Sequence, residues 1–205
     1  LTITATDEEF TISLDGSTYT YDGTGKAITN TPTSTAATGT TSYVYSFEED
    51  GEYVADLSSL TKIDAGTYTV YVKGTNPNYS KTATTTATLT INKADLTITV
   101  IAQSHTYDGT AKGEDNKTYT TGIDAKVTAA TLQGGDILSS ITLNGTKIEK
   151  GEYENEIVAS AAAVTYGHET DKTAITDNYN VTYVAGKLTI TATDEEFTIS
   201  LDGST

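Results

Sequence analysis

The sequence predicts an all-β protein in which two related β-sandwich modules follow one another along the chain. Three observations predict this fold class. The composition is typical of strands, with 45 threonines and 14 tyrosines among 205 residues and no cysteine, methionine or tryptophan. Apolar and polar residues alternate along several short segments. Matching landmarks occur in the same order in the two halves of the chain.

The longest repeat is a stretch of eighteen residues, LTITATDEEFTISLDGST, which occurs unchanged at 1–18 and at 188–205. The offset between the two copies is 188 − 1 = 187 residues. Self-similarity at a fixed period is the sequence signature of repeat proteins. We therefore expect one period of a longer tandem array, in which 188–205 begin the next copy.

A second repeat lies inside the first, because TYDGTGK at 20–26 is matched by TYDGTAK at 106–112. Later landmarks keep their order, with DAGTYTV, NPNYS and ATLTINK in the first half and EKGEY, TDNYN and GKLTITA in the second. The shared order predicts two related modules in tandem, each an Ig-like β-sandwich. The predicted divisions are 1–9 as the tail of a preceding repeat and junction, 10–93 and 94–190 as the modules, and 191–205 as a junction and the start of the next repeat.

The alternation of apolar and polar residues is clearest at the start of each module, where it predicts a strand with one buried face. The inward positions are Phe10, Ile12 and Leu14 in the first module and Leu96, Ile98 and Val100 in the second. Asp-Gly at 50–51 and Asn-Gly at 144–145 predict hairpin turns, since both residues accept a positive φ. No amphipathic helix of useful length is evident: ADLSSL at 55–60 indicates one short turn, and VASAAAV at 158–164 is ambiguous.

Two motifs recur in both modules and are the candidate structural sites. The first is a Tyr-Asp-Gly turn, formed by Tyr21, Asp22 and Gly23 and again by Tyr107, Asp108 and Gly109. The second is a Gly-x-Tyr element, formed by Gly66 and Tyr68 after Asp64 and by Gly151 and Tyr153 after Glu149.

The Gly-x-Tyr element resembles the tyrosine corner of immunoglobulin-like sandwiches, in which a tyrosine hydroxyl bonds to the backbone a few residues upstream. We expect Tyr68 to be mostly buried, with its hydroxyl bonded to backbone near Asp64, because a buried phenol needs a partner. The alternative is a glycine turn followed by an ordinary strand tyrosine.

Three stretches, TYTYDGTGKAI at 18–28, HTYDGTAK at 105–112 and NYNVTYVAGKLTI at 178–190, are similar to the YDG- and MBG-type repeat domains of large bacterial cell-surface proteins and adhesins. The resemblance covers about the whole chain. It implies a non-catalytic structural repeat of an extracellular stalk or filament at the bacterial cell surface. The first module departs from the family pattern, because NYSKTATTTATLTI at 78–91 replaces the last strand motif.

The expected partners are neighbouring copies of the same repeat, joined covalently or by strand addition. An alternative function is an adhesive binding module, which recognises a glycan or host protein through loops of the second module between Tyr107 and Tyr153 and near His168. The formal net charge of −16 argues against a nucleic-acid partner. No apolar run approaches the ~20 residues of a membrane span.

An acidic cluster at the module junction is a candidate calcium site, because calcium takes six to eight oxygen ligands. The cluster consists of Asp7, Glu8 and Glu9, repeated as Asp194, Glu195 and Glu196. The alternative is an acidic run that faces solvent, and no other cofactor is expected. No catalytic residue is predicted, because His105 and His168 stand in unrelated contexts that indicate exposed loops.

Overall fold

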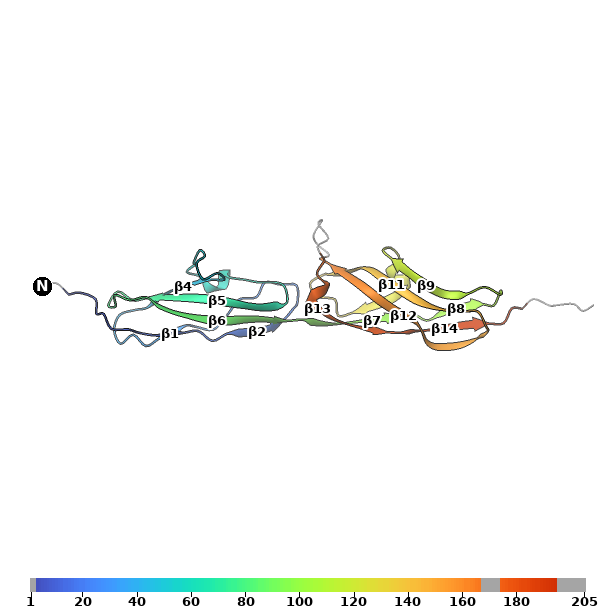
Figure 1. The fold of residues 1–205 in the computed structure, drawn as a ribbon, viewed down its shortest axis with the longest axis horizontal. Helices are drawn as coiled ribbons and strands as arrows, with labels where there is room; N and C mark the ends of the chain where they lie inside the picture. Colours follow the sequence, from blue (N-terminus) through green and yellow to red (C-terminus); the bar gives the residue numbers. More distant parts are fainter. Residues whose placement is uncertain (1–2, 167–173, 195–205) are drawn as a thin grey trace, which may run out of the picture. The chain divides into compact units, whose positions relative to one another are not determined.

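A computed structural model describes residues 3–166 and 174–194 (Figure 1). In that part of the chain the regular structure consists of strands and three short 3-10 helices. The helices are η1 (Leu57–Ser59), η2 (Ile123–Ala125) and η3 (Thr176–Asn178). The protein is therefore all-β, as the composition and the alternation predict, and η1 forms within the predicted turn at 55–60.

The chain divides into two compact units. Unit 1 comprises Leu1–Asp95 with the later segments Gln133–Asp136 and Tyr166–Asn180, and unit 2 comprises Leu96–Leu132, Ile137–Thr165 and Val181–Thr205. The predicted limit between the two modules at 93 stays a prediction. The inclusion of two later segments in unit 1 has no counterpart in the sequence-based division.

Unit 1 is built from a four-stranded sheet and a two-stranded sheet. The strands are β1 (Ile12–Ser13), β2 (Ser17–Thr20), β3 (Thr33–Ser34), β4 (Ser42–Ser46), β5 (Gly66–Thr75) and β6 (Ala83–Asn92). The larger sheet has the order β2-β6-β5-β4, and β1 pairs with β3. Neighbours in the larger sheet are antiparallel except that β2 runs parallel to β6.

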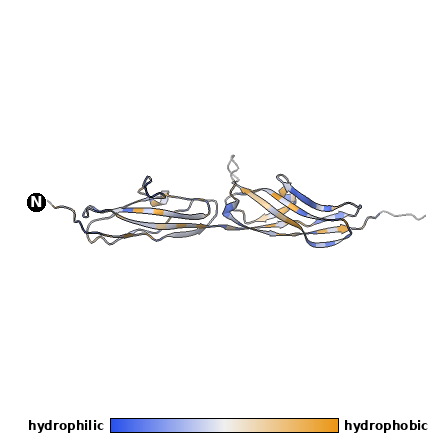
Figure 2. Ribbon diagram, in the orientation of Figure 1, coloured by the Kyte–Doolittle hydropathy of each residue, from blue (hydrophilic) through white to orange (hydrophobic). Residues whose placement is uncertain are grey.

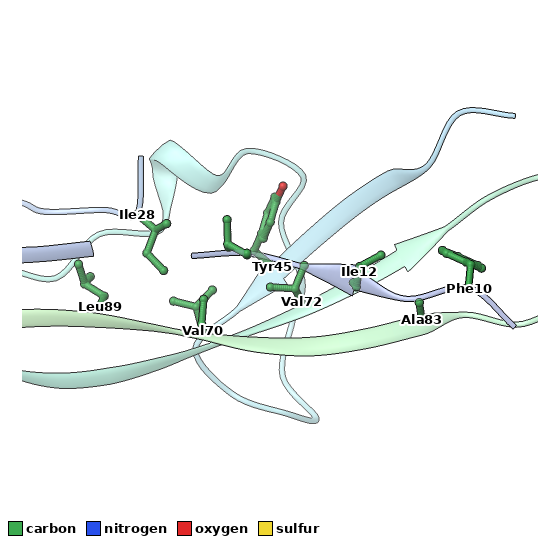
Figure 3. Packing of buried hydrophobic residues seen from close by; sticks show 10 residues of the cluster. Phe10, Ile12, Ile28, Tyr45, Val70, Val72, Ala83 and Leu89 are labelled. Atoms are coloured by element: carbon green, nitrogen blue, oxygen red, sulfur yellow. The ribbon is translucent and has the colours of Figure 1, made fainter. Parts of the chain in front are cut away.

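The core of unit 1 is formed by alternate apolar residues of these strands together with apolar residues just outside them; Figure 2 shows the apolar positions in orange. Figure 3 shows core residues contributed by β1, β4, β5 and β6. The buried cluster consists of Phe10, Ile12, Leu14, Ile28, Tyr45, Val70, Val72, Ala83, Ala87 and Leu89. Complete burial of each large apolar side chain contributes about 1.5–3 kcal/mol, so this cluster is a large stabilising contribution to the unit.

The strands that follow are β7 (Ala94–Val100), β8 (Gln103–Thr106), β9 (Lys112–Tyr119), β10 (Val127–Ala130), β11 (Ile137–Lys147), β12 (Gly151–Thr165), β13 (Tyr179–Val184) and β14 (Gly186–Thr191). They form a five-stranded sheet, β8-β14-β12-β11-β9, and a three-stranded sheet, β10-β7-β13. Strand β8 runs parallel to β14, which repeats the relationship of β2 and β6. The same parallel pairing thus follows the same sequence landmarks in both halves.

The predicted inward faces at the two module starts are buried. Phe10, Ile12 and Leu14 are each 7 % exposed, and Leu96, Ile98 and Val100 are at most 3 % exposed. The residues between them are exposed or partly buried. The two-residue period therefore places equivalent side chains in equivalent environments.

One predicted hairpin turn is present and the other is wrong. At 48–51 the amide of Gly51 donates to the Glu48 oxygen (3.2 Å), and the flanking Tyr45 and Val54 pair as an antiparallel bridge. The Asn-Gly at 144–145 instead lies inside β11. Gly145 has a φ of 142°, and a Cβ there would lie 2.0 Å from the Glu156 oxygen. Glycine serves at this position for close strand packing rather than for a turn.

Candidate structural and binding sites

The two Tyr-Asp-Gly turns close through the same hydrogen bonds. Asp22 Oδ1 accepts from the amide (2.9 Å) and hydroxyl (2.6 Å) of Thr24, and Asp22 Oδ2 accepts from Lys26 Nζ (2.5 Å). Gly23 has a φ of 77°, a conformation that glycine adopts without strain. The lysine and threonine bonds hold the pKa of the Asp22 carboxyl at about 2. This turn explains why threonine and lysine belong to the motif.

The second turn repeats these contacts with the same lengths. Asp108 Oδ1 accepts from the amide (2.9 Å) and hydroxyl (2.6 Å) of Thr110, and Asp108 Oδ2 accepts from Lys112 Nζ (2.5 Å). Gly109 has a φ of 81°, and the same bonds lower the pKa of the Asp108 carboxyl. The motif therefore specifies a local structure wherever it occurs in the described chain.

The two Gly-x-Tyr elements also share one geometry. The hydroxyl of Tyr68 donates to the main-chain oxygen of Asp64 (2.8 Å), and that of Tyr153 donates to the main-chain oxygen of Glu149 (2.8 Å). Because the acceptor is backbone, glutamate replaces aspartate without changing the bond. Tyr68 is partly buried, so it is more exposed than expected.

The glycine of each element lies beneath the tyrosine ring. A Cβ on Gly66 would lie 3.0 Å from the hydroxyl oxygen of Tyr68, and one on Gly151 would lie 2.9 Å from Cζ of Tyr153. Neither glycine has a positive φ. The requirement for glycine is therefore steric and comes from the ring, not from the backbone conformation.

A buried cluster in unit 1 joins Tyr21 to residues that sequence reasoning missed. The hydroxyls of Tyr21 (2.8 Å) and Tyr179 (2.6 Å) both donate to Oδ2 of Asp136, and the two rings meet edge to face at 5.4 Å. All three residues are at most 5 % exposed. Burial, with the bond to Asp136, raises the pKa of both phenols above their usual range. Tyr179 belongs to a landmark of the sequence, whereas Asp136 carries no local signal.

A second buried charge lies in unit 2, where Glu114 is 4 % exposed. Its Oε1 accepts from Lys126 Nζ (2.8 Å) and Gln103 Nε2 (2.8 Å), and its Oε2 accepts from the hydroxyl of Tyr119 (2.5 Å). Desolvation raises the pKa of the Glu114 carboxyl, but these bonds outweigh it and the net pKa is lowered. The cluster is a satisfied ion pair, which sequence reasoning missed because Gln103 and Lys126 lie outside β9, the strand that holds Glu114 and Tyr119.

Two of the acidic residues of the predicted junction, Asp7 and Glu9, have side-chain partners within unit 1. Asp7 Oδ1 accepts from the hydroxyl of Ser80 (2.5 Å), and Glu9 forms an ion pair with Lys81 (2.9 Å). Glu8 and Asp194 are exposed, and Glu195 and Glu196 lie outside the described residues. Residues 3–166 and 174–194 contain no group of three or more histidine or acidic side chains placed to hold a metal ion.

His105 is expected in an exposed loop but lies in strand β8. Its Nε2 is 3.4 Å from Oε1 of Gln103 in the same strand. His168 lies outside the described residues. Within that described part, no helix is long and apolar enough to cross a membrane.

A shallow recess on the outer face of the larger sheet of unit 1 has a volume of about 320 Å³. Its lining residues are Glu49, Tyr53, Tyr71, Val72, Lys73, Thr84, Thr85 and Thr86. Lys73 Nζ lies 3.9 Å above the ring of Tyr53, and the Tyr53 hydroxyl donates to the Glu49 main-chain oxygen (2.8 Å). The recess therefore combines a fixed aromatic ring with hydroxyl and ammonium groups.

No protein-family model matches the chain, and no curated protein matches it. One similar solved structure is SGBP-B of the Bacteroides ovatus mixed-linkage glucan utilisation locus in complex with a mixed-linkage heptasaccharide (14 % identity, TM-score 0.28, covering 87 % of this chain and 43 % of that one). Another is a SusE-like, surface-located polysaccharide-binding protein of the Bacteroides thetaiotaomicron heparin utilisation locus (15 % identity, TM-score 0.22, covering 89 % of this chain and 34 % of that one). This chain thus spans less than half the length of either protein, and these likenesses assign no site or ligand to it.

Proposed function

We propose that this chain is a non-catalytic structural repeat of a bacterial extracellular surface protein, built of two Ig-like β-sandwich modules in tandem and related to the YDG- and MBG-type repeats. The observation that supports this proposal best is that the two Tyr-Asp-Gly turns have the same structure. Their hydrogen bonds have the same partners and lengths, and their glycines have nearly the same φ. A motif that rebuilds the same turn in each half of the chain is typical of the architecture of a repeat protein.

The second shared feature is the Gly-x-Tyr hydrogen bond to backbone, which is the defining bond of the tyrosine corner. It occurs with the same length in both halves of the chain. Together with the alternating inward faces and the parallel β2–β6 and β8–β14 pairs, it supports two copies of one sandwich design.

The test of this proposal is the length of the natural protein. Denaturing gel electrophoresis of the protein from its source is expected to give one chain much longer than the 21.6 kDa of this sequence, with a 187-residue period in its peptide map. Subunits of about that mass that separate on denaturation would contradict a covalent array, and would favour strand addition between short chains.

A second candidate function is glycan binding, which the recess beside Tyr53 and Tyr71 favours. An aromatic ring offers an apolar face for the C–H face of a sugar, and the surrounding hydroxyl and ammonium groups offer hydrogen bonds. This candidate differs from the expected loop site of the second module, because the recess lies on a sheet of unit 1. The two solved structures above are named for the same ligand class, but the candidate rests on the recess.

Glycan binding is tested by presenting the 205-residue chain to a glycan array and measuring the hits by calorimetry. Tyr53→Ala is expected to abolish binding, whereas Tyr183→Ala, at a tyrosine 38 % exposed in unit 2, is expected to leave it unchanged. An array without hits, or hits equally strong for both variants, would exclude the recess as a glycan site.

A further inference from the structure

The Tyr107 turn of unit 2 has the same local structure as the Tyr21 turn. Within the described residues, however, no segment packs on it as Gly134 and Tyr179 pack on the Tyr21 turn. Tyr21 is 1 % exposed, and a Cβ on Gly23 would lie 2.7 Å from Cα of Gly134. Tyr107 is only partly buried, and within the described residues nothing lies within 4 Å of a Cβ on Gly109. One motif therefore occurs once covered and once open.

In unit 1 one short segment, residues 92–95, is hydrogen-bonded both to Tyr21 and to Asn180, the residue next to the tyrosine that covers Tyr21. The amide of Tyr21 donates to the oxygen of Asn92 (2.8 Å). Three residues further on, Oδ1 of Asp95 accepts from Nδ2 of Asn180 (3.2 Å), which follows Tyr179. The ring of Tyr179 packs on that of Tyr21. Two attachments three residues apart thus bring the two tyrosines together.

The repeated eighteen-residue stretch makes two equivalent hydrogen bonds. The copy at 188–205 binds Tyr107, and the copy at 1–18 binds the residue next to Tyr79. The amide of Tyr107 donates to the oxygen of Thr191 (2.9 Å), and Thr191 corresponds to Thr4 because 191 − 187 = 4. Three residues after Thr4, Oδ1 of Asp7 accepts from the hydroxyl of Ser80 (2.5 Å), which follows Tyr79. The spacing between the attachments is again three residues.

Tyr79 is the counterpart of Tyr179 in its place and in one of the two hydrogen bonds of the Tyr179 hydroxyl. The hydroxyl of Tyr79 accepts the amide of Ala37 (2.9 Å), and the hydroxyl of Tyr179 accepts the amide of Gln133 (2.9 Å). Tyr79 is partly buried, so part of its side chain remains available for a further contact.

Two shallow recesses border the two copies of the repeated stretch. The recess on unit 1 has a volume of about 320 Å³ and is lined by Ile3, Thr4, Ala5, Thr6, Thr38, Pro77 and Asn78. The recess on unit 2 has a volume of about 280 Å³ and is lined by Lys150, Gly151, Glu152, Thr189, Ile190, Thr191 and Ala192. Residues 3–5 and 190–192 have the same sequence, Ile-Thr-Ala. In a tandem array a single copy of this sequence would therefore border both recesses.

We propose that the Tyr107 turn of unit 2 is a docking surface for a second copy of this chain, which contributes Tyr79. Tyr107 packs against Tyr79 of that copy as Tyr21 packs against Tyr179. The inference rests on the proposed tandem repeat and names the contact between successive repeats. It also sets the strength of that contact, because Thr38 follows Ala37 where Gly134 follows Gln133. A threonine cannot approach Gly109 as closely as Gly134 approaches Gly23, so the contact is looser than that of Tyr21.

The test uses a two-copy chain, in which residues 1–187 are followed by the complete 205 residues, so that the shared stretch joins the copies. Tetranitromethane nitrates accessible tyrosine rings, and mass spectrometry of the peptides measures the rate. Thr110→Ser in one copy labels its Tyr107 peptide by mass and keeps the hydroxyl that bonds to Asp108. Placing this label in the first or in the second copy gives a matched pair without a disruptive substitution.

We expect nitration of Tyr107 in the first copy to be about tenfold slower than in the second copy, since the first copy is followed by a complete unit 1. Tyr21 is expected to react more slowly than either. Tyr183, which is 38 % exposed, is the internal reference for reagent activity. Equal rates for Tyr107 in the two copies would overturn the docking surface while leaving the tandem repeat intact. Natural subunits of about 21.6 kDa would instead count against the repeat array itself, whatever the nitration rates.

Discussion

The hydroxyl of Tyr68 donates a 2.8 Å hydrogen bond to the main-chain oxygen of Asp64, and the ring of Tyr68 covers Gly66 on the way. The bond fixes the loop before β5 to the start of that strand. Phe47 packs edge to face on the same ring at 6.2 Å. The tyrosine therefore ties the loop, the strand and a neighbouring segment of unit 1 together.

Loss of this hydroxyl is expected to destabilise unit 1. Tyr68→Phe removes one hydrogen bond, which contributes about 1 kcal/mol. For a unit of this size that corresponds to a fall in melting temperature of about 4–8 °C, measurable by circular dichroism. Tyr43→Phe is the matched control, because no hydrogen bond of its hydroxyl is seen in the described chain. An equal fall in both variants would mean that the Asp64 bond contributes nothing specific.

The glycine beneath the ring is expected to be coupled to the tyrosine. Gly66→Ala places a Cβ about 3.0 Å from the Tyr68 hydroxyl oxygen, so the ring must shift and its bond to Asp64 weakens. Because both substitutions damage one contact, Gly66→Ala with Tyr68→Phe should cost less than the sum of the single costs. Urea denaturation of the four chains of the cycle measures this coupling, and simple additivity would refute the steric role of Gly66.

The Asp22 turn predicts a loss of stability in acid. The Lys26 and Thr24 bonds lower the pKa of Asp22 to about 2, below the ~3.9 of an unfolded chain. The stabilisation is therefore complete above about pH 4 and is lost as the pH falls towards 2. The Asp22 side chain is 44 % exposed, so the effect is modest and weakens with salt. Asp22→Asn should flatten the fall in urea midpoint over this range. A pH profile unchanged by Asp22→Asn would contradict the assignment.

Removing only Glu114 from its buried ion pair is expected to lower the free energy of unfolding more than replacing both partners with apolar residues. Glu114→Leu leaves the Lys126 ammonium without its partner and should cost about 3 kcal/mol. Adding Lys126→Met removes the uncompensated charge and should recover much of that loss. The free energy of unfolding from urea titration measures both. A double variant less stable than Glu114→Leu alone would show that the pair does not act as a unit.

The strands were predictable from the sequence because their information is local. Alternation at Phe10 and Ile12, or at Leu96 and Ile98, needs only a two-residue period and a buried face. The Asn-Gly turn at 144–145 failed for a physical reason, since glycine also permits the close approach of neighbouring strands. Asp136 could not be found, because it meets Tyr21 across 115 residues of sequence and no local pattern records such a contact. Glu114 could not be found either, because its partners Gln103 and Lys126 lie 11 and 12 residues away on other elements and share no periodic pattern with it.

The repeated stretch makes the sharpest prediction, because it places one residue type in two environments. Ile190 is 1 % exposed in β14, and its counterpart Ile3, 187 residues earlier, is 88 % exposed. Ile190→Ala removes buried methyl groups and leaves a cavity, and should cost about 2–5 kcal/mol. Ile3→Ala removes an exposed side chain and should change the free energy of unfolding by less than about 0.5 kcal/mol.

Urea denaturation of the 205-residue chain at several protein concentrations separates the two outcomes. Equal costs for Ile3→Ala and Ile190→Ala would contradict the exposure of Ile3. A cost for Ile3→Ala that grows with protein concentration would show that Ile3 is buried by pairing between chains, as an exposed strand edge permits. In a two-copy chain the matching isoleucine at the joint is buried in β14 of the first copy, so its substitution should there carry the full cost of Ile190→Ala. The same isoleucine substitution would then leave the free energy of unfolding unchanged or lower it, depending only on whether a complete unit precedes it in the chain.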